Sequence, residues 1–306
     1  MASIAKQCSL VILYGIGGLS DVGRHAILAA LEYGKKEKAS ATTTTTTATT
    51  SSAQPSKIVD KITVFTEYPE LLDETNWESG CPEPKQNPSK THPDIVNVIK
   101  VDNWTDTENV DKLASYIENA DAVISCLGHR QPGMKYPQLI ERGIISADGN
   151  RQVIDAIDKI NSGTTTTQKN KRVVVISSVG IQEDWPPMEF HWAGNVMKIM
   201  FKWTKASRAF DDLNKMEVSY KEYNTKQERA DQSDKKIDYL FIRPTGISEE
   251  AVPVGKWWLQ EEKHKGAVGM DMAKMDVARY MVQEALNPTK HERGIVIGAE
   301  MTKVCT

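Results

Sequence analysis

The chain has 306 residues, of which 38 are lysine or arginine and 41 are aspartate or glutamate, so its formal charge at pH 7 is −3. This near balance argues against a partner that is nucleic acid or an anionic membrane surface. Hydrophobic residues make up 40% of the chain, and the longest apolar runs fall well short of the ~20 residues of a membrane span, so we expect a soluble, core-forming protein.

The cysteines and the N-terminus indicate the compartment. Cys8, Cys81, Cys126 and Cys305 are scattered and show neither metal-site nor disulfide spacing, so we expect a reducing environment and no bound metal. The N-terminal segment passes from a short apolar run directly into a glycine-rich turn, without a cleavage-site pattern. We interpret it as a first strand of a cytoplasmic protein; import into an organelle stays open as the alternative.

Three stretches of unusual composition are typical of flexible surface loops. One is rich in threonine, one contains four prolines, and one combines threonine with lysine and asparagine. Such sequences lack the large apolar groups that offset the entropy of ordering. We therefore expect loop insertions at residues 35–57, 76–93 and 161–171.

Between these loops, continuous apolar strands alternate with amphipathic helices. In chain order we predict strands at Leu10–Tyr14, Ile62–Thr66, Val96–Val101, Ala122–Cys126, Arg172–Ile176, Tyr239–Ile242 and Ile295–Ile297. Helices are predicted at Arg24–Tyr33, with Gly34 as the stop, and at Asn109–Asn119, Gly149–Ile160 and Met275–Leu286. This alternation indicates a doubly wound, mostly parallel α/β sheet in a single domain, residues 1–306, with substrate-side segments at 184–235 and 247–272.

The turn between the first strand and the first helix is the first functional candidate. Glycines at this place allow a tight turn, let backbone N–H groups approach a pyrophosphate, and let the helix pack closely on the strand. The strand–turn–helix context favours dinucleotide binding over a merely tight structural turn. The expected cofactor-binding residues are Gly15, Gly17, Gly18, Ser20, Asp21, Val22, Gly23 and Arg24.

Two acidic residues bear on the cofactor. Asp21 interrupts the standard glycine spacings, and its carboxylate competes with a pyrophosphate for the helix N-terminus; it is either an N-cap that points away or a sign of weakened cofactor binding. Glu67, after the second strand, suits the two hydroxyls of a ribose and repels a 2′-phosphate, which favours NAD over NADP. The alternatives are that Glu67 is an exposed loop residue and that Arg24 neutralises a phosphate.

Segments in the same order resemble the atypical short-chain dehydrogenase/reductases with an NAD(P)H-binding, NmrA-like domain, including biliverdin-IXβ/flavin reductase relatives. They are VILYGIGG with VGRH, KVDNWTD, DAVISCLG, RVVVISSVG, DYLFIRPTG and KMDVARYMVQEAL. The likeness covers most of the chain and implies a Rossmann fold, a nicotinamide cofactor and oxidoreductase activity. The enlarged glycine turn and Glu67, where the family often has a basic residue, depart from the pattern.

The resemblance also implies roles for individual residues. Asp102 and Asn103 would lie against the adenine; Cys126, Leu127 and Gly128 would pass under the two riboses; Ser177, Ser178 and Pro244 would border the nicotinamide; and Gly128–Arg130 would line the substrate side.

The catalytic Tyr-x-x-x-Lys pair of the short-chain dehydrogenases is missing. Tyr223 and Lys226 are three residues apart, which makes them either a substitute pair or part of a solvated helix. Hydride transfer to a conjugated acceptor such as a flavin, quinone or tetrapyrrole needs mainly orientation of the two reactants. Candidate catalytic proton donors are His129, alternatively an exposed loop histidine, and Ser178, alternatively a strand cap.

Aromatic residues concentrate in residues 184–209. They could wall a flat-ring pocket over the nicotinamide, although core packing of a helix is the more frequent reason for such spacing. Trp257 and Trp258 could bound the same pocket or anchor a loop. We expect an NAD(P)H-dependent oxidoreductase that acts on a small conjugated molecule, as a monomer or homodimer. The alternative is a non-catalytic NAD(P)-binding redox sensor or assembly scaffold.

Overall fold

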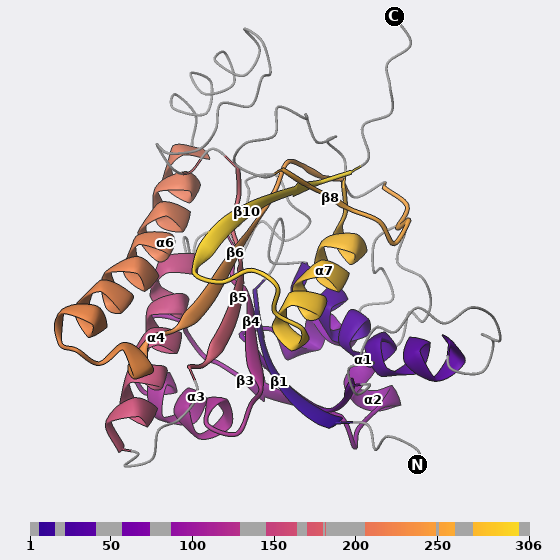
Figure 1. Cartoon of the computed structure of the whole chain (residues 1–306). Helices are drawn as coiled ribbons and strands as arrows, with labels where there is room; N and C mark the ends of the chain where they lie inside the picture. The colour runs from indigo at the N-terminus through magenta and orange to yellow at the C-terminus, as the bar shows by residue number, and fades with distance from the viewer. Residues whose placement is uncertain are drawn as a thin grey trace, which may run out of the picture.

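The computed structural model describes residues 6–15, 22–40, 57–73, 87–128, 145–163, 170–179, 181, 206–248, 251–260 and 272–299. Within them an eight-stranded sheet has the order β3-β2-β1-β4-β5-β6-β10-β8 and helices on both faces (Figure 1). The first six strands therefore follow the order 3-2-1-4-5-6 of a doubly wound dinucleotide-binding fold. The predicted doubly wound, mostly parallel sheet is confirmed.

The strands of the sheet are parallel to their neighbours except β8, which runs antiparallel to β10. Their bounds are β1 (Lys6–Tyr14), β2 (Lys57–Thr66), β3 (Val96–Lys100), β4 (Ala122–Cys126), β5 (Arg172–Ile176), β6 (Asp238–Pro244), β8 (Trp258–Gln260) and β10 (Arg293–Gly298). Two short strands, β7 (Ile247–Ser248) and β9 (Met272–Ala273), form a separate parallel pair.

The helices divide between the two faces of the sheet (Figure 1). One face carries α1 (Val22–Ser40) and α7 (Lys274–Leu286); the other carries α3 (Asn109–Ile117), α4 (Ser146–Gly163) and α6 (Ala206–Arg229). Shorter elements are α2 (Pro88–Thr91) and the 3-10 turns η2 (Pro69–Asp73) and η4 (Ser233–Lys235). No helix in the described ranges is long and apolar enough to cross a membrane.

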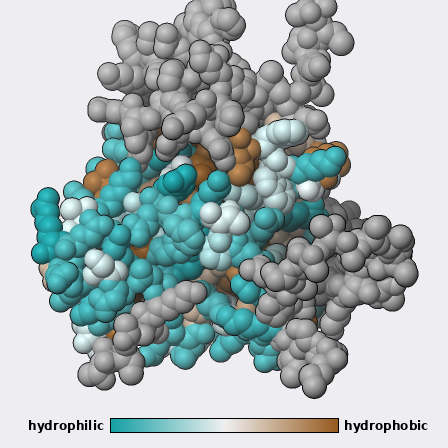
Figure 2. Space-filling model, in the orientation of Figure 1, coloured by the Kyte–Doolittle hydropathy of each residue, from teal (hydrophilic) through white to brown (hydrophobic). Residues whose placement is uncertain are grey.

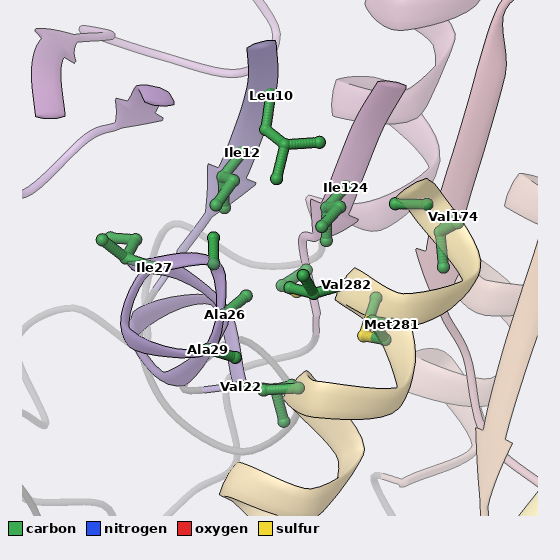
Figure 3. Close-up of a cluster of buried hydrophobic side chains, with 14 of the residues drawn as sticks. Leu10, Ile12, Val22, Ala26, Ile27, Ala29, Ile124, Val174, Met281 and Val282 are labelled. Carbon is green, nitrogen blue, oxygen red and sulfur yellow. The ribbon is translucent and has the colours of Figure 1, made fainter. Parts of the chain in front are cut away.

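Both faces of the sheet are buried, which explains the continuous apolar strands. Along β1, Leu10 and Ile12 point into the core beneath α1 and α7, while Val11 and Leu13 point into the core beneath α3, α4 and α6. Figure 3 shows the first core, where Leu10 and Ile12 of β1 lie near Ala26 of α1. A strand packed on both sides has no solvent face, so its sequence does not alternate.

The long helix α6 is amphipathic. Its buried side chains recur at the spacing of one helical face, and they are Asp212, Leu213, Met216, Glu217, Tyr220, Tyr223, Asn224 and Gln227. The residues between them are mostly exposed, and the surface over α6 and α4 in Figure 2 is mostly hydrophilic. Two carboxylates therefore lie on the buried face of this helix, where charged groups require partners.

The structure corrects several predicted boundaries. The first helix does not stop at Gly34 but continues to Ser40, so residues 35–40 of the expected insertion are helical. Glycine costs a helix only about 1 kcal/mol relative to alanine, and the lysines, glutamate and alanine that follow are good helix formers. The other two expected insertions are also shorter, because Pro88–Thr91 form α2 and residues 161–163 belong to α4.

Candidate functional site

The candidate site lies along the edge of the sheet where the parallel strands end. Tyr14, the last residue of β1, pairs with Thr66 of β2 on one side and with Cys126 of β4 on the other. Gly15, Glu67 and Leu127, which follow these residues, therefore lie at one edge. The strand order reverses between β1 and β4, and such a switch point is where doubly wound sheets bind nucleotides.

Backbone hydrogen bonds extend this edge in both directions. The Val101 N–H donates to the Thr66 carbonyl at 2.9 Å, which brings the following Asp102 and Asn103 beside the end of β2. The Ser177 N–H donates to the Ile242 carbonyl at 2.7 Å, so Ser177 and Ser178 lie beside the end of β6. The edge thus gathers the predicted site residues Gly15, Val22, Gly23, Arg24, Glu67, Asp102, Asn103, Cys126, Leu127, Gly128, Ser177, Ser178 and Pro244.

Other predicted site residues fall outside the described ranges. They are Gly17, Gly18, Ser20, Asp21 and His129, together with Arg130 and the aromatic side chains of residues 184–209. The two interpretations of Asp21 and of His129 therefore both stand as predictions.

The start of α1 packs directly on the ends of β1 and β4. A Cβ atom on Gly23 would lie 2.2 Å from the Cβ of Tyr14 and 3.2 Å from the Cβ of Cys126. Only glycine permits this approach, which is the role of the last glycine in a dinucleotide-binding turn. The helix start, with the buried Arg24 in its first turn, therefore fits the diphosphate of a dinucleotide.

Glu67 is buried at the end of β2. Its side chain is 4% exposed, and its Oε1 accepts a hydrogen bond from the backbone N–H of Trp104 at 3.3 Å. The interpretation of Glu67 as an exposed loop residue is therefore wrong. A carboxylate held at this place fits the position of an adenosine ribose in the fold.

At the end of β4, the backbone rather than the side chains is available to a ligand. The side chains of Cys126 and Leu127 are fully buried, and burial raises the pKa of the Cys126 thiol above its ordinary value. This thiol therefore stays protonated and is a poor nucleophile. The Leu127 carbonyl accepts a hydrogen bond from the Ser146 hydroxyl at 2.8 Å, which ties the end of β4 to the start of α4.

The N-terminus of α4 is capped by a side chain of α6. The Asp212 carboxylate accepts hydrogen bonds from the backbone N–H groups of Ser146 at 3.0 Å and Ala147 at 3.1 Å. Burial raises the pKa of Asp212, and these backbone hydrogen bonds lower it by less. The anion-binding end of α4 is thus filled by the protein itself.

The tyrosines of α6 face α4 and do not form a catalytic pair. The Tyr220 hydroxyl donates to Asn150 Oδ1 and the Tyr223 hydroxyl to Asp158 Oδ1, each at 3.0 Å. Burial raises the pKa of Tyr223 to about 12, whereas a catalytic phenol needs a lowered pKa. The Lys226 side chain is exposed to solvent, whereas Tyr223 is buried. The substitute Tyr223–Lys226 pair is wrong, and Tyr223 belongs to the buried face.

An ion pair that the sequence analysis missed lies beside Ser177. The Arg243 guanidinium contacts Glu217 twice, with Nε 3.0 Å from Oε1 and Nη2 2.5 Å from Oε2, and the Ser177 hydroxyl donates to the same Oε1 at 2.6 Å. All three residues are buried. A signal existed in the sequence, because Arg243 directly follows the apolar run Tyr239–Ile242 and a buried arginine needs an anionic partner.

The Trp257-Trp258 segment acts as a loop anchor through its first residue. The Trp257 ring packs on Tyr280 of α7 with ring centroids 5.4 Å apart, while Trp258 is about half exposed. Asp276 at the start of α7 accepts hydrogen bonds from the backbone N–H groups of Val254 and Gly255. Loop anchoring is therefore the interpretation that the structure supports for Trp257.

Comparisons with known proteins agree with this geometry. Residues 83–288 match the sequence profile of the NAD(P)H-binding family. A sequence search among curated proteins gives no significant match.

Solved structures share the fold over nearly the whole chain. ChuY from Escherichia coli, described as an anaerobillin reductase, is 15% identical with a TM-score of 0.53, covering 96% of this chain and 99% of its own. The oxidoreductase YlbE from Lactococcus lactis is 15% identical with a TM-score of 0.51, covering 95% and 91%. A putative NAD-dependent epimerase/dehydratase from Bacillus halodurans is 13% identical with a TM-score of 0.51, covering 95% of each chain.

Proposed function

The chain belongs to the NAD(P)H-binding family, and from that premise we propose that it is an NAD(P)H-dependent reductase of a conjugated small molecule. The observation that carries the proposal is the single edge formed by six strand ends at the switch point of the sheet. The closely packed Gly23 at the start of α1 adds the geometry that a diphosphate requires.

The cofactor would lie across this edge. The diphosphate would be held by the backbone of Gly15, Val22 and Gly23 and by Arg24. The adenosine would contact Glu67 at its ribose and Asp102 and Asn103 at its adenine. The two riboses would lie over Cys126, Leu127 and Gly128, and the nicotinamide would lie beside Ser177, Ser178 and Pro244. When bound, the cofactor supplies hydride, and the protein supplies orientation and exclusion of water.

The proposed class of acceptor rests on the lack of a catalytic tyrosine on α6. Tyr220 and Tyr223 are buried against α4 with their hydroxyls already donated, so α6 offers no phenol for exchange with an alcohol or ketone in the described ranges. A flavin, quinone or linear tetrapyrrole accepts hydride at an electron-poor conjugated centre and delocalises the resulting charge. Its proton can come from water, from Ser178, which is partly exposed, or from His129. The description of ChuY makes a linear tetrapyrrole the first acceptor to test.

Glu67 favours NADH as the reductant. A 2′-phosphate next to this buried carboxylate would bring two negative charges together in a poorly hydrated place. The two hydroxyls of an NADH ribose would instead donate to it.

Turnover and binding assays test the proposal together. The protein is mixed with NADH or NADPH and a panel of a flavin, a quinone and a linear tetrapyrrole, and the nicotinamide absorbance is followed. Loss of that absorbance with at least one acceptor is expected. Saturable binding of the cofactor without turnover on any acceptor would contradict the reductase and favour a non-catalytic NAD(P)-binding sensor or scaffold. Absence of binding would contradict both.

A further inference from the structure

The backbone of Trp104 links the end of β2 to helix α4 through two consecutive peptide units. The Trp104 N–H donates to Glu67 Oε1 at 3.3 Å, and the Trp104 carbonyl accepts a hydrogen bond from Nε2 of Gln152 on α4. The indole ring is fully buried and lies 3.4 Å from the place of a Cβ on Gly149. The side chains of Glu67 and Gln152 thus bind the N–H and the carbonyl of Trp104, and the indole ring is buried.

Every member of this chain of contacts is shielded from solvent. Glu67 is 4% exposed and Gln152 is 5% exposed, so water does not compete well for either group. In the described part of the chain the amide oxygen of Gln152 accepts no hydrogen bond, so this side chain is held by the bond from its Nε2 to the Trp104 carbonyl. Buried polar groups keep the geometry that their hydrogen bonds impose, because breaking them leaves unsatisfied atoms. One hydrogen bond of the Glu67 carboxylate is thus connected through the Trp104 backbone to Gln152, which lies 85 residues further along the chain.

We propose that Gln152 is a positioning residue for coenzyme selection, which acts through Trp104 on the Glu67 carboxylate. This inference rests on the proposed function, in which Glu67 faces the adenosine ribose. A carboxylate that is fixed in place binds the 2′-hydroxyl and repels a 2′-phosphate. A carboxylate that is free to turn away accommodates the phosphate at little cost. Selection against NADPH thus depends on the charge of Glu67 and on the Trp104 backbone, which Gln152 holds at the carbonyl next to the N–H that binds Glu67.

The test compares two variants by binding alone. Gln152→Met keeps an unbranched side chain of similar length and removes the amide that donates to Trp104. Gln227→Met is the matched control, because Gln227 is also a buried glutamine at 5% exposure but lies on α6 beside Tyr223. Dissociation constants for NADH and for NADPH are measured by nicotinamide fluorescence without any acceptor. Glu67→Gln is included to remove the charge itself.

The readout is the ratio of the NADPH to the NADH dissociation constant. A variant that is merely less stable weakens both coenzymes by the same factor, so the ratio reports positioning and not folding. Loss of one hydrogen bond is expected to reduce the ratio in Gln152→Met by about fivefold, mainly through tighter NADPH binding. Glu67→Gln should reduce it further, and Gln227→Met should leave it at the wild-type value.

Two results would overturn the inference, and they differ in what they imply for the proposed function. A wild-type ratio in Gln152→Met together with a reduced ratio in Glu67→Gln would remove Gln152 from coenzyme selection and leave the reductase intact. Failure of the wild-type protein to bind either coenzyme would remove both the inference and the proposed function.

Discussion

Two clusters of charged side chains hold the same two strands, β5 and β6, at their opposite ends. At the carboxyl end, Glu217 and Arg243 pair with almost no exposure to solvent, and Ser177 completes the cluster. At the amino end, Arg172 contacts Asp238 at 2.9 Å and Glu284 at 3.3 Å.

In the amino-end cluster the exposure of the side chains increases from Glu284 to Asp238 to His291. Its Glu284 is buried, its Asp238 side chain is 18% exposed, and the His291 that contacts Asp238 is 56% exposed. Glu284 also accepts hydrogen bonds from the backbone N–H groups of Thr289 and Lys290. In the described residues each charge of the amino-end cluster has more than one partner, whereas Arg243 meets the Glu217 carboxylate in one close two-point contact.

The difference has a physical consequence for the proposed site. Charged groups without water must keep their partners, so the carboxyl-end cluster fixes the place where β5, β6 and α6 meet beside Ser177 and Pro244. A rigid wall at this place would hold a nicotinamide in one orientation. The amino-end cluster lies at the opposite end of the strands from the candidate site, so we expect it to affect stability.

The largest expected effect is the loss of Glu217. Glu217→Gln removes the carboxylate that the buried Arg243 contacts within the described residues, and we expect the free energy of unfolding to fall by about 3–5 kcal/mol. Urea denaturation followed by circular dichroism measures the change. A double variant, Glu217→Leu with Arg243→Met, removes both charges and should recover much of the loss. Equal losses in the single and double variants would show that charge pairing is not what the cluster provides.

Arg172→Met at the amino end is expected to cost less, about 2–3 kcal/mol. Asp238 keeps its contact with His291, and Glu284 keeps the N–H groups of Thr289 and Lys290, so neither carboxylate is left alone. The same denaturation experiment measures it, and NADH affinity should equal that of the wild type. A loss as large as that of Glu217→Gln would remove the contrast between the two ends.

The pH dependence of stability tests Asp212, which lies near the carboxyl ends of the strands. Burial raises its folded-state pKa above the ordinary value of 3.8, so the folded chain keeps a proton that the unfolded chain has released. The contribution of this group to stability is therefore full below that value and is lost as pH rises through the folded-state pKa. Asp212→Asn does not titrate, so the wild type should lose stability relative to this variant on going from acid to neutral pH. Denaturation midpoints that shift in parallel for both proteins would contradict this.

The smallest effect is expected at His291. Its side chain is 56% exposed where it contacts Asp238, and contacts made by exposed side chains contribute little to stability. His291→Asn should change the free energy of unfolding by no more than about 0.5 kcal/mol. A scan of thermal melting against salt concentration should show the same curve for variant and wild type. A change above 1.5 kcal/mol, which is about the cost of losing a hydrogen bond to a charged group, would mean that the amino-end cluster is as tightly coupled as the other one.

The sequence predicted the sheet and the edge that carries the candidate site. The bounds of β4 and β5 agree with the predicted Ala122–Cys126 and Arg172–Ile176. A strand buried on both faces is apolar throughout, so its sequence marks its bounds. The family resemblance named the residues at or after the ends of β3, β4, β5 and β6, and they lie at one edge because parallel strands end there. The helix that continues past Gly34 was mispredicted because one glycine weakens a helix without ending it.

Partnerships between distant side chains were decided only by the tertiary structure. Glu217 with Arg243, Asp212 with the start of α4, and Gln152 with Trp104 join residues that are 26 or more positions apart. Strand and helix periods tell which residues are buried, because burial is a property of one element. They do not tell which buried groups meet, because a meeting depends on how two elements pack, and packing is set by the whole core. The sequence thus determined the sheet and the edge that carries the candidate site, and the packing of α4 and α6 decided which buried groups meet beside that edge.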